Sequence, residues 1–479
     1  MEVAVDSALH TLAKEPALIA RHSHGVLRHG GEGHKEHACL LMVEQAVRLA
    51  AFFHDLGHLP FSHEFETALE DYWDGLKKCE RERSPLRGVI LHGSLTDSGD
   101  DAPDASHNRM KIHEGIGHAV AEMLLRETLR AKDTILDRVE STEAQHVKNM
   151  MRVCFSVARE ILIAESTPKA DATVMWLHAL IDGEIDADRC DFILRDARNY
   201  GFEFASYDLQ RLLDNMVVVS TAERDPHLAV RYNGISAVES FLTARYRSYQ
   251  YAVRHHKVAQ IGAALRYCIV TLLKRVDAGE RDSISDEIGD FVSTLEAIYA
   301  HNPEDINANI VTLSKFARYD DIWLMTQLRA LDLHKPGKEW AALVCWRQSN
   351  PGPYSLWKRA DDFPVGIDID DLKSFNRGLN SLDDNAWRKC AGDVKARQML
   401  VTRHIFSPLK TDIMIVRRDG DLVSIRDIAP SVGGLEESWK SDIQVQVFVP
   451  STTTFDEAKV SVLADMIDPL KERGQNMRR

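Results

Sequence analysis

The most constraining feature of the sequence is a histidine-rich stretch at the end of an apolar run. Residues 52–63 read Phe-Phe-His-Asp-Leu-Gly-His-Leu-Pro-Phe-Ser-His. The run before it, residues 39–53, is rich in Leu, Met, Val, Ala and Phe, which predicts a largely buried helix that carries His54 and Asp55 into the interior. Buried ionisable groups cost several kcal/mol unless they are compensated, and a divalent cation compensates a carboxylate beside neutral imidazoles. We therefore interpret His54 and Asp55 as two metal ligands; the alternative is a His-Asp pair that caps a helix end.

Composition limits the class of protein and its compartment. The chain has 479 residues, 44% of them hydrophobic and 28% charged, and no tract long enough to span a membrane. The N-terminus lacks the features of an export signal, and the seven cysteines are scattered without a Cys-x-x-Cys pair. We expect a cytoplasmic protein with reduced thiols and no membrane partner. The net charge of −14 makes nucleic acid an unexpected main partner.

A second acidic cluster lies in residues 183–196. At helical spacing Asp188, Phe192, Arg195 and Asp196 share one face. We expect this cluster to complete the site that begins at His54.

The chain changes character near residue 275. Before it the pattern is helical, apart from a polar segment at 77–108 that we expect to be a flexible insertion, and it ends in a long helix over 236–274. After it, helices over 287–334 are followed by strands at 413–416 and 422–425, joined by the turn pair Asp419-Gly420, and by an alternating strand near 443–449. The expected fold class is mostly α: a helical domain over residues 1–275 and a smaller α+β domain over 276–479, regulatory or used for oligomerisation.

Four ordered motifs together resemble the HD-domain superfamily. They are His22-Ser23-x-Gly25-Val26, the segment 54–65, His113-Glu114, and the segment 186–196. Within the superfamily they are most similar to the deoxynucleoside triphosphate triphosphohydrolases (dGTPase-like dNTPases), over roughly residues 20–275. The resemblance implies an HD-domain helical core.

The resemblance also implies a ligand set and a cofactor. The four metal ligands would be His22, His54, Asp55 and Asp188. The neighbouring histidines 24, 29, 34 and 37 stay open as substitutes for His22, which alone matches the His-Ser-x-Gly-Val pattern. The cofactor would be a divalent metal ion, and two histidines with two aspartates accommodate Mn, Mg, Fe, Zn or Ni.

Catalytic and substrate-binding residues follow from the same resemblance. The implied catalytic set is His58, His63, Glu66, His113 and Glu114, in which His63 and His113 give a proton to the leaving 5′-oxygen or hold a water. The implied substrate-binding set is Arg21, Arg189, Phe192, Asp196, Arg245, Tyr249, His256 and Lys257. Within it Arg189, Arg245, His256 and Lys257 would hold polyphosphate, and Asp196 would accept a hydrogen bond from a sugar hydroxyl.

The first hypothesis for function is therefore a metal-dependent dNTP triphosphohydrolase that releases a deoxynucleoside and inorganic triphosphate. Its partners would be the nucleotide substrate, a second regulatory nucleotide at a subunit interface and further copies of the chain in a homo-oligomer. Depletion of dNTPs would suit an antiviral role. Two alternatives stay open: an HD phosphohydrolase acting on a nucleoside monophosphate, a cyclic nucleotide or a nucleic-acid end, and a non-catalytic nucleotide sensor. The histidines that would donate protons argue against the sensor.

Overall fold

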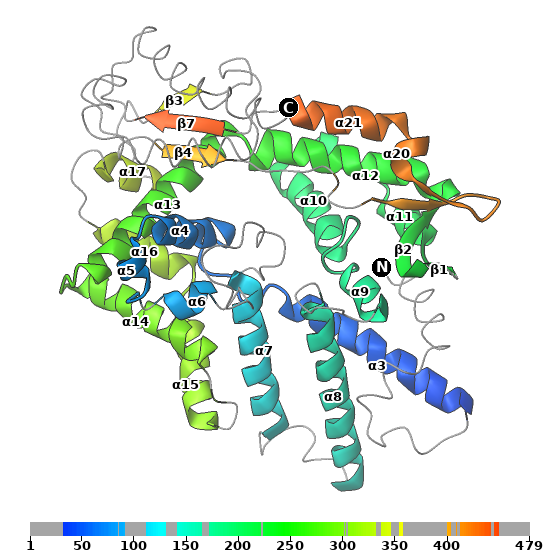
Figure 1. Ribbon diagram of the computed structural model, residues 1–479, viewed down its shortest axis with the longest axis horizontal. Helices are drawn as coiled ribbons and strands as arrows, with labels where there is room; N and C mark the ends of the chain where they lie inside the picture. Colours follow the sequence, from blue (N-terminus) through cyan, green and yellow to red (C-terminus); the bar gives the residue numbers. More distant parts are fainter. Residues whose placement is uncertain are drawn as a thin grey trace.

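A computed structural model describes residues 32–84, 86–91, 112–130, 141–164, 172–221, 224–300, 302, 305–331, 337–345, 354–357, 400–403, 409, 412–441 and 445–449. Over these residues the chain is mostly helical with a small β component, which confirms the expected fold class (Figure 1). No described helix is long and apolar enough to cross a membrane.

Helices make up most of the elements up to Asp277. They are α3 (Glu32–Phe53), α4 (His63–Asp74), α5 (Lys78–Arg81), α6 (Arg87–Leu91), α7 (Ile112–Arg130), α8 (Ser141–Leu162), α9 (Ala172–His178), α10 (Ala187–Tyr200), α11 (Leu209–Asn215), α12 (Ile235–Ser248) and α13 (His256–Asp277), with 3-10 turns at Glu203–Ala205 and Tyr232–Gly234 and a π-helix, η5, at Tyr249–Val253. The later helices are α14 (Ser283–Tyr299), α15 (Ile306–Phe316), α16 (Asp321–Ala330), α17 (Gly337–Val344), α20 (Ile425–Ile428) and α21 (Pro430–Ser441).

Two small sheets accompany the helices. One has the order β1-β2-β5-β6, formed by β1 (Met216–Thr221), β2 (Arg224–Arg231), β5 (Met414–Val416) and β6 (Leu422–Ser424). The pair β5–β6 is the antiparallel hairpin predicted around Asp419-Gly420, and β2 pairs with β5 in parallel. The other sheet has the order β3-β7-β4, formed by β3 (Tyr354–Trp357), β7 (Val445–Val449) and β4 (Leu400–Arg403). The strand predicted near 443–449 is therefore confirmed.

Three clusters of buried side chains form the interior. The first joins α4, α6, α7, α13, α14, α16 and α17. The second joins α3, α8 and α9, and the third joins α10, α11 and α12 to the first sheet and to α20 and α21. Figure 1 shows α3 and α8 crossing in the lower part of the molecule, with α7 beside α8. Each cluster thus contributes to the predicted site. The second supplies the end of α3, the first supplies the starts of α4 and α7, and the third supplies the start of α10.

The first cluster extends across the predicted domain boundary at residue 275. Phe65 and Met123 from the N-terminal side pack in the same core as Phe291, Leu324 and Trp340 from the C-terminal side. The division into two domains stays a prediction, but the described residues on its two sides share one hydrophobic core.

Two segments differ from the expected helices and loops. The long helix expected over 236–274 is interrupted by η5 and by an extended His255, whose ring Nδ1 accepts a hydrogen bond from the Lys257 amide at the start of α13. The polar insertion expected from residue 77 begins with ordered structure: Leu86, Val89 and Ile90, in and beside α6, are buried in the first cluster. These three apolar side chains explain why this part of the segment folds onto the core; residues 92–108 lie outside the described residues.

Candidate metal centre and active site

The end of α3 presents His54 in a defined orientation. Met42, Val43, Ala46 and Ala50 recur at helical spacing and bury one face of α3 against α8 and α9, which fixes where the helix ends. The His54 Nδ1 atom lies 2.7 Å from the carbonyl oxygen of Ala51. Because a carbonyl only accepts, Nδ1 carries the hydrogen and Nε2 is left with its lone pair.

The Nε2 atom of His54 fits a metal ligand. It is buried and no hydrogen-bond donor reaches it. It lies 3.2 Å from an Asp55 carboxylate oxygen, and ligand atoms of His54, Asp55 and Asp188 all lie within 4.8 Å of one another. Ligands that are each roughly 2.1 Å from one cation are at most about 4.2 Å apart, so these atoms need only small movements to share one ion. The three residues could therefore hold a divalent metal ion, as the sequence predicts.

Asp188 reaches this cluster from the first turn of α10. The helix begins at a capped N-terminus, where the Asp186 carboxylate accepts a hydrogen bond from the Arg189 amide at 2.6 Å. Asp188 is exposed, but partial desolvation of its carboxylate raises its pKa, and the negative charge of Asp55 raises it further. Two carboxylates that repel each other at one point are stabilised by a cation between them.

A second group of four residues adjoins the first: His58, His63, Glu66 and His113 have ligand or proton-bearing atoms within 4.8 Å of one another. Two of the histidines form hydrogen bonds with Glu66. His113 Nδ1 lies 2.7 Å from one carboxylate oxygen of Glu66, and His63 Nδ1 lies 3.1 Å from the other. The His58 and His113 rings stack with centroids 4.2 Å apart. Burial raises the pKa of Glu66, but the hydrogen bonds from His113 and His63 outweigh it and hold that pKa well below its usual range. Glu66 is thus ionised and fixes both rings.

His58 and Asp55 connect the two groups. His58 Nε2 lies 3.1 Å from an Asp55 carboxylate oxygen, and His58 Nδ1 lies 2.9 Å from the Ser62 hydroxyl. The hydrogen bond from His58 is the main reason that the pKa of Asp55 is lowered, although burial opposes it. Asp55 is therefore a candidate metal ligand that also contacts a candidate proton donor, His58.

The turn before α4 is strained. Phe61 and Ser62 have φ of 59° and 54°, and they are the non-glycine residues with positive φ in the described part of the chain. A bulky residue in this region is rare and costs on the order of 1–3 kcal/mol. The turn is anchored by Leu59 and Phe65, which are buried in the core on either side of it, and by a 2.7 Å hydrogen bond from the Phe61 amide to the Asp321 carboxylate. The strained residues lie between His58 and His63 in the sequence, and the rings of these two histidines lie 4.9 Å apart at an angle of 85°.

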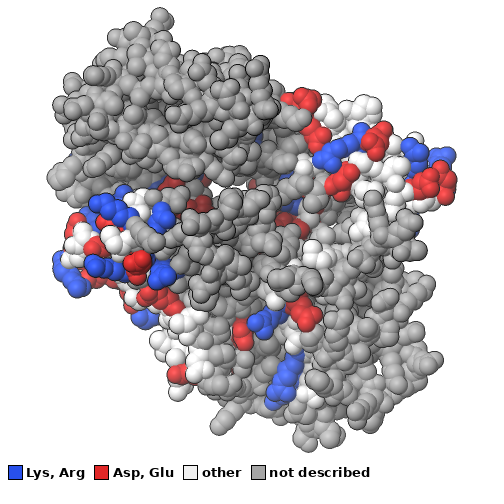
Figure 2. Space-filling model, in the orientation of Figure 1, with Lys and Arg blue, Asp and Glu red and all other residues white. Residues whose placement is uncertain are grey.

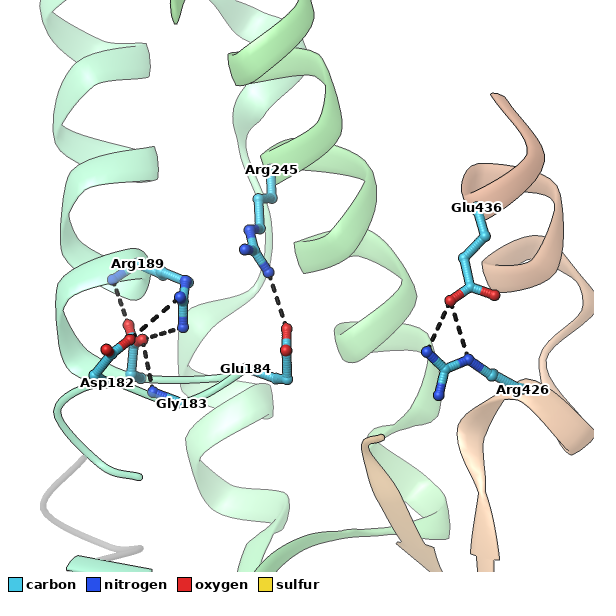
Figure 3. Close-up of polar contacts among 8 residues, drawn as sticks. Asp182, Gly183, Glu184, Arg189, Arg245, Arg426 and Glu436 are labelled. Carbon is cyan, nitrogen blue, oxygen red and sulfur yellow. Dashed lines mark hydrogen bonds and ion pairs between the residues drawn. The ribbon is translucent and has the colours of Figure 1, made fainter. Parts of the chain in front are cut away.

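Two predicted polyphosphate ligands are paired with carboxylates. Arg189 pairs with Asp186 and lies 3.4 Å from Asp182, and the Gly183 amide donates to the same Asp186 carboxylate. Figure 3 shows Arg189 beside Asp182, and Arg245 pointing at Glu184. The side chains of Arg245 and Glu184 are only 2% and 7% exposed, with 3.2 Å between nitrogen and oxygen. The loop before α10 is thus held by both arginines. Their role in holding polyphosphate stays a prediction.

Other predicted substrate residues belong to α10, η5 and the start of α13. The rings of Phe192 and Tyr249 lie 6.3 Å apart, and those of His255 and His256 lie 4.4 Å apart. Asp196 lies 3.7 Å from its neighbour Arg195. The Lys257 ammonium lies 3.5 Å from the side-chain oxygen of Gln260. Glu114, predicted as catalytic, is half-buried in α7. Arg21 and His22 lie outside the described residues.

Three residues that shape the site were not predicted as site residues: Ser62, Glu184 and Asp321. Ser62 belongs to the histidine-rich stretch and could have been singled out there. Glu184 lies in the acidic cluster at 183–196, but its partner is 61 positions away in the sequence. Asp321 carries no local signal, and its partner is 260 positions away. On the face in Figure 2 the described acidic and basic side chains are interspersed.

The fold and the site define a mostly helical protein with a His/Asp cluster that could hold a divalent metal ion. No family model matches the chain. It is 27% identical over 212 residues to the uncharacterized protein YwfO of Bacillus subtilis, covering 44% of this chain and 33% of that protein. It is 27% identical over 156 residues to an uncharacterized protein of Methanocaldococcus jannaschii, covering 33% of this chain and 30% of that protein. The chain spans about a third of the length of these curated relatives.

Solved structures give weaker likenesses. A phosphohydrolase of Bacteroides thetaiotaomicron is similar with a TM-score of 0.46 at 18% identity, covering 87% of each chain. A hypothetical protein of Aquifex aeolicus is similar with a TM-score of 0.40 at 15% identity, covering 89% of this chain and 95% of that one. At scores this low the likenesses establish neither a family nor an activity for this chain.

Proposed function

We propose that this chain is a metal-dependent phosphohydrolase and that its substrate is a deoxynucleoside triphosphate, cleaved to a deoxynucleoside and inorganic triphosphate. The observation that carries the proposal is the buried, unbonded Nε2 of His54 facing Asp55 and Asp188, directly beside a group of histidines oriented by one ionised glutamate. A metal ligand set next to proton donors is an arrangement that supports metal-assisted phosphoester hydrolysis.

A divalent cation held by His54, Asp55 and Asp188 would offset negative charge on the phosphate and lower the pKa of a water. The chain's own residues supply the proton transfer. His63 is 69% exposed and its Nδ1 contacts Glu66, so Nε2 is the ring atom directed elsewhere, and it is the candidate to protonate the leaving oxygen. His113, 7% exposed and bonded to the same Glu66 through both its ring and its amide, would hold its position during the reaction.

The preference for a deoxynucleoside triphosphate rests on the motif resemblance and on the surroundings of α10. Phe192 and Tyr249 would contact the sugar and base, and Asp196 would accept a hydrogen bond from a sugar hydroxyl. His256 and Lys257, at the start of α13, would meet the phosphates.

A second candidate follows from the paired arginines. Because Arg189 and Arg245 already contact carboxylates, a phosphoester with less charge than a triphosphate is favoured by that observation. Hydrolysis of a nucleoside monophosphate or a cyclic nucleotide is the alternative.

The test is mass spectrometry of the products after incubation of the purified full chain, with Mn²⁺ or Mg²⁺, with each dNTP, each rNTP and their mixtures. Asp55→Ala serves as the inactive variant. Asp191→Asn serves as the matched control, since Asp191 is an exposed aspartate of α10 that pairs with Arg195. We expect deoxynucleoside plus intact triphosphate from the wild type and the control but not from Asp55→Ala. Phosphate release from monoesters alone would support the second candidate, and no turnover of any phosphoester would refute both.

Partners are proposed with the function. We expect a homo-oligomer, and we expect a second nucleotide to activate it. Size-exclusion chromatography with light scattering, with and without dNTPs, and activity measured in nucleotide mixtures check these two points. Reduced virus yield in cells that express the wild type, but not Asp55→Ala, would support the antiviral role.

A further inference from the structure

The strained turn between His58 and His63 is held by a residue from a distant part of the chain. The Phe61 amide donates a 2.7 Å hydrogen bond to the Asp321 carboxylate, and 260 positions separate the two residues. Asp321 lies in the first turn of α16, where a carboxylate is favoured by the helix dipole. The contact therefore joins the histidine-rich stretch to a helix that plays no other part in the site.

The local sequence does not explain why the turn adopts this conformation. Phe61 and Ser62 both have positive φ, and neither is glycine. Backbone of this kind persists only where the surroundings hold it, and it concentrates where geometry matters for function. Within the turn, the Ser62 amide donates to the Leu59 carbonyl at 2.7 Å. The Phe61 amide is satisfied from outside the turn, by Asp321.

The strained conformation has a direct effect on the candidate proton donors. It places the Ser62 hydroxyl 2.9 Å from His58 Nδ1 and starts α4 at His63, so that His63 reaches Glu66 one turn later. If the turn relaxed to negative φ, the Ser62 hydroxyl and the first turn of α4 would move together.

We propose that Asp321 is a positioning residue of the active site: by holding the Phe61 amide it keeps the strained turn in place and thereby sets the mutual orientation of His58 and His63. This inference deepens the proposed phosphohydrolase function and rests on it for its kinetic consequence. Its structural consequence is independent of any activity.

Asp320 provides a matched control. It precedes Asp321 on the same helix, is also an aspartate, and caps α16 by accepting a 2.8 Å hydrogen bond from the Trp323 amide. Asp320→Ala should therefore weaken α16 without touching Phe61. Asp321→Asn keeps an oxygen that can accept from the Phe61 amide and serves as the conservative rescue.

The experiment compares wild type, Asp321→Ala, Asp321→Asn and Asp320→Ala as full chains, with two readouts. The first is histidine carbethoxylation mapped by mass spectrometry in metal-free protein. His58 is 22% exposed in the intact site, so we expect its modification to be several-fold faster in Asp321→Ala and unchanged in the other two variants. The second is steady-state kinetics on the substrate identified for the wild type. We expect kcat of Asp321→Ala to fall roughly tenfold, with KM within about twofold, because proton donation rather than binding is affected.

The outcomes separate the two proposals. Equal effects of Asp321→Ala and Asp320→Ala would reduce Asp321 to a general structural role and overturn the inference. Unchanged His58 modification in Asp321→Ala would overturn it as well. If the wild type hydrolyses no phosphoester, the proposed function fails, while the modification pattern still decides whether Asp321 positions the histidines.

Discussion

A β-carbon on Gly57 would lie 1.9 Å from the carbonyl oxygen of His113 and 2.3 Å from the amide nitrogen of Gly117. The segment that carries His54, Asp55 and His58 therefore lies directly on the backbone of α7, and this close approach brings His113 over His58. The His113 carbonyl and the Gly117 amide both belong to α7, so moving either of them would displace His113.

Replacing Gly57 should consequently damage stability and site together. We expect Gly57→Ala to lower the free energy of unfolding by more than about 3 kcal/mol, because the added methyl group meets backbone on both sides. Urea denaturation followed by circular dichroism measures this. Gly289→Ala is the matched control: Gly289 lies within α14 with nothing near its added β-carbon, so alanine should stabilise by up to about 1 kcal/mol. Similar effects of the two substitutions would contradict the close approach.

Metal affinity should depend on one face of α10. Asp188→Asn is expected to weaken Mn²⁺ binding by roughly a hundredfold or more, since it removes a charged ligand, and Asp191→Asn should change it less than about twofold. Isothermal titration of metal-free protein compares the two. If the Mn²⁺ Kd of Asp188→Asn is within about twofold of the Kd of Asp191→Asn, Asp188 is not a metal ligand.

The effect of backbone strain at Ser62 on stability can be measured separately from the effect of its hydroxyl group. Both Ser62→Ala and Ser62→Gly lose the hydrogen bond to His58, but only glycine adopts the φ of 54° and ψ of −125° without strain. We expect the glycine variant to be more stable than the alanine variant by about 1 kcal/mol, measured by urea denaturation. Equal stabilities would show that the turn stores little strain.

The buried ion pair of Arg245 and Glu184 should be sensitive to the loss of one partner. We expect Arg245→Met to destabilise the fold by about 3–5 kcal/mol, because it removes the cationic partner of the buried Glu184 carboxylate, and the double variant with Glu184→Gln to recover part of this loss. Arg195→Ala is the control; Arg195 pairs with Asp191 at the surface, so its loss should cost less than about 0.5 kcal/mol. A small cost at Arg245 would instead leave this arginine available for phosphate.

Stability should fall on mild acidification because of His118. Burial, aided by the charges of Arg159 and His178, lowers the pKa of His118 to about 4 against the opposing effect of Glu114. The folded protein keeps the ring neutral, whereas the unfolded chain binds a proton below its ordinary pKa, so stability is lost as the pH falls from about 6.5 towards 4. We expect His118 to account for about 1–2 kcal/mol of loss between pH 8 and pH 5. His118→Leu should flatten this part of the pH profile, and an unchanged profile would contradict the shift.

The parts of the site that follow from local pattern were predictable. The apolar run before His54 predicted the helix α3, and helical spacing placed Asp188 and Asp196 on α10. The expectation that the run carries Asp55 into the interior was wrong: only one face of α3 packs in the core, so Phe52 is 67% exposed and the Asp55 side chain is 52% exposed. That Asp188 meets His54 and Asp55 from more than a hundred residues away was predictable only from the combination of motifs. Asp419-Gly420 predicted the β5–β6 hairpin because this turn pair has few other uses between two apolar runs.

The rest depended on contacts that no local pattern encodes. The β1–β2 hairpin was missed although Val217, Val218 and Val219 form a β-branched run that could have indicated it. The interruption at η5 has no breaker residue and depends on tertiary packing. The pairing of Arg245 with Glu184 and of Phe61 with Asp321 could not be inferred, because contacts between residues far apart in the sequence produce no periodic sequence pattern.

The shared core has a consequence for how the protein is made. Phe65 packs edge-on against Phe291, and the core around it also includes Trp340. During synthesis the histidine-rich stretch leaves the ribosome more than two hundred residues before these partners exist, and 260 residues before Asp321 can hold Phe61. The stretch is therefore among the first described parts of the chain to be translated and among the last to reach its final geometry, and a nascent chain stalled before α14 would carry the metal-ligand motif without the core that shapes it.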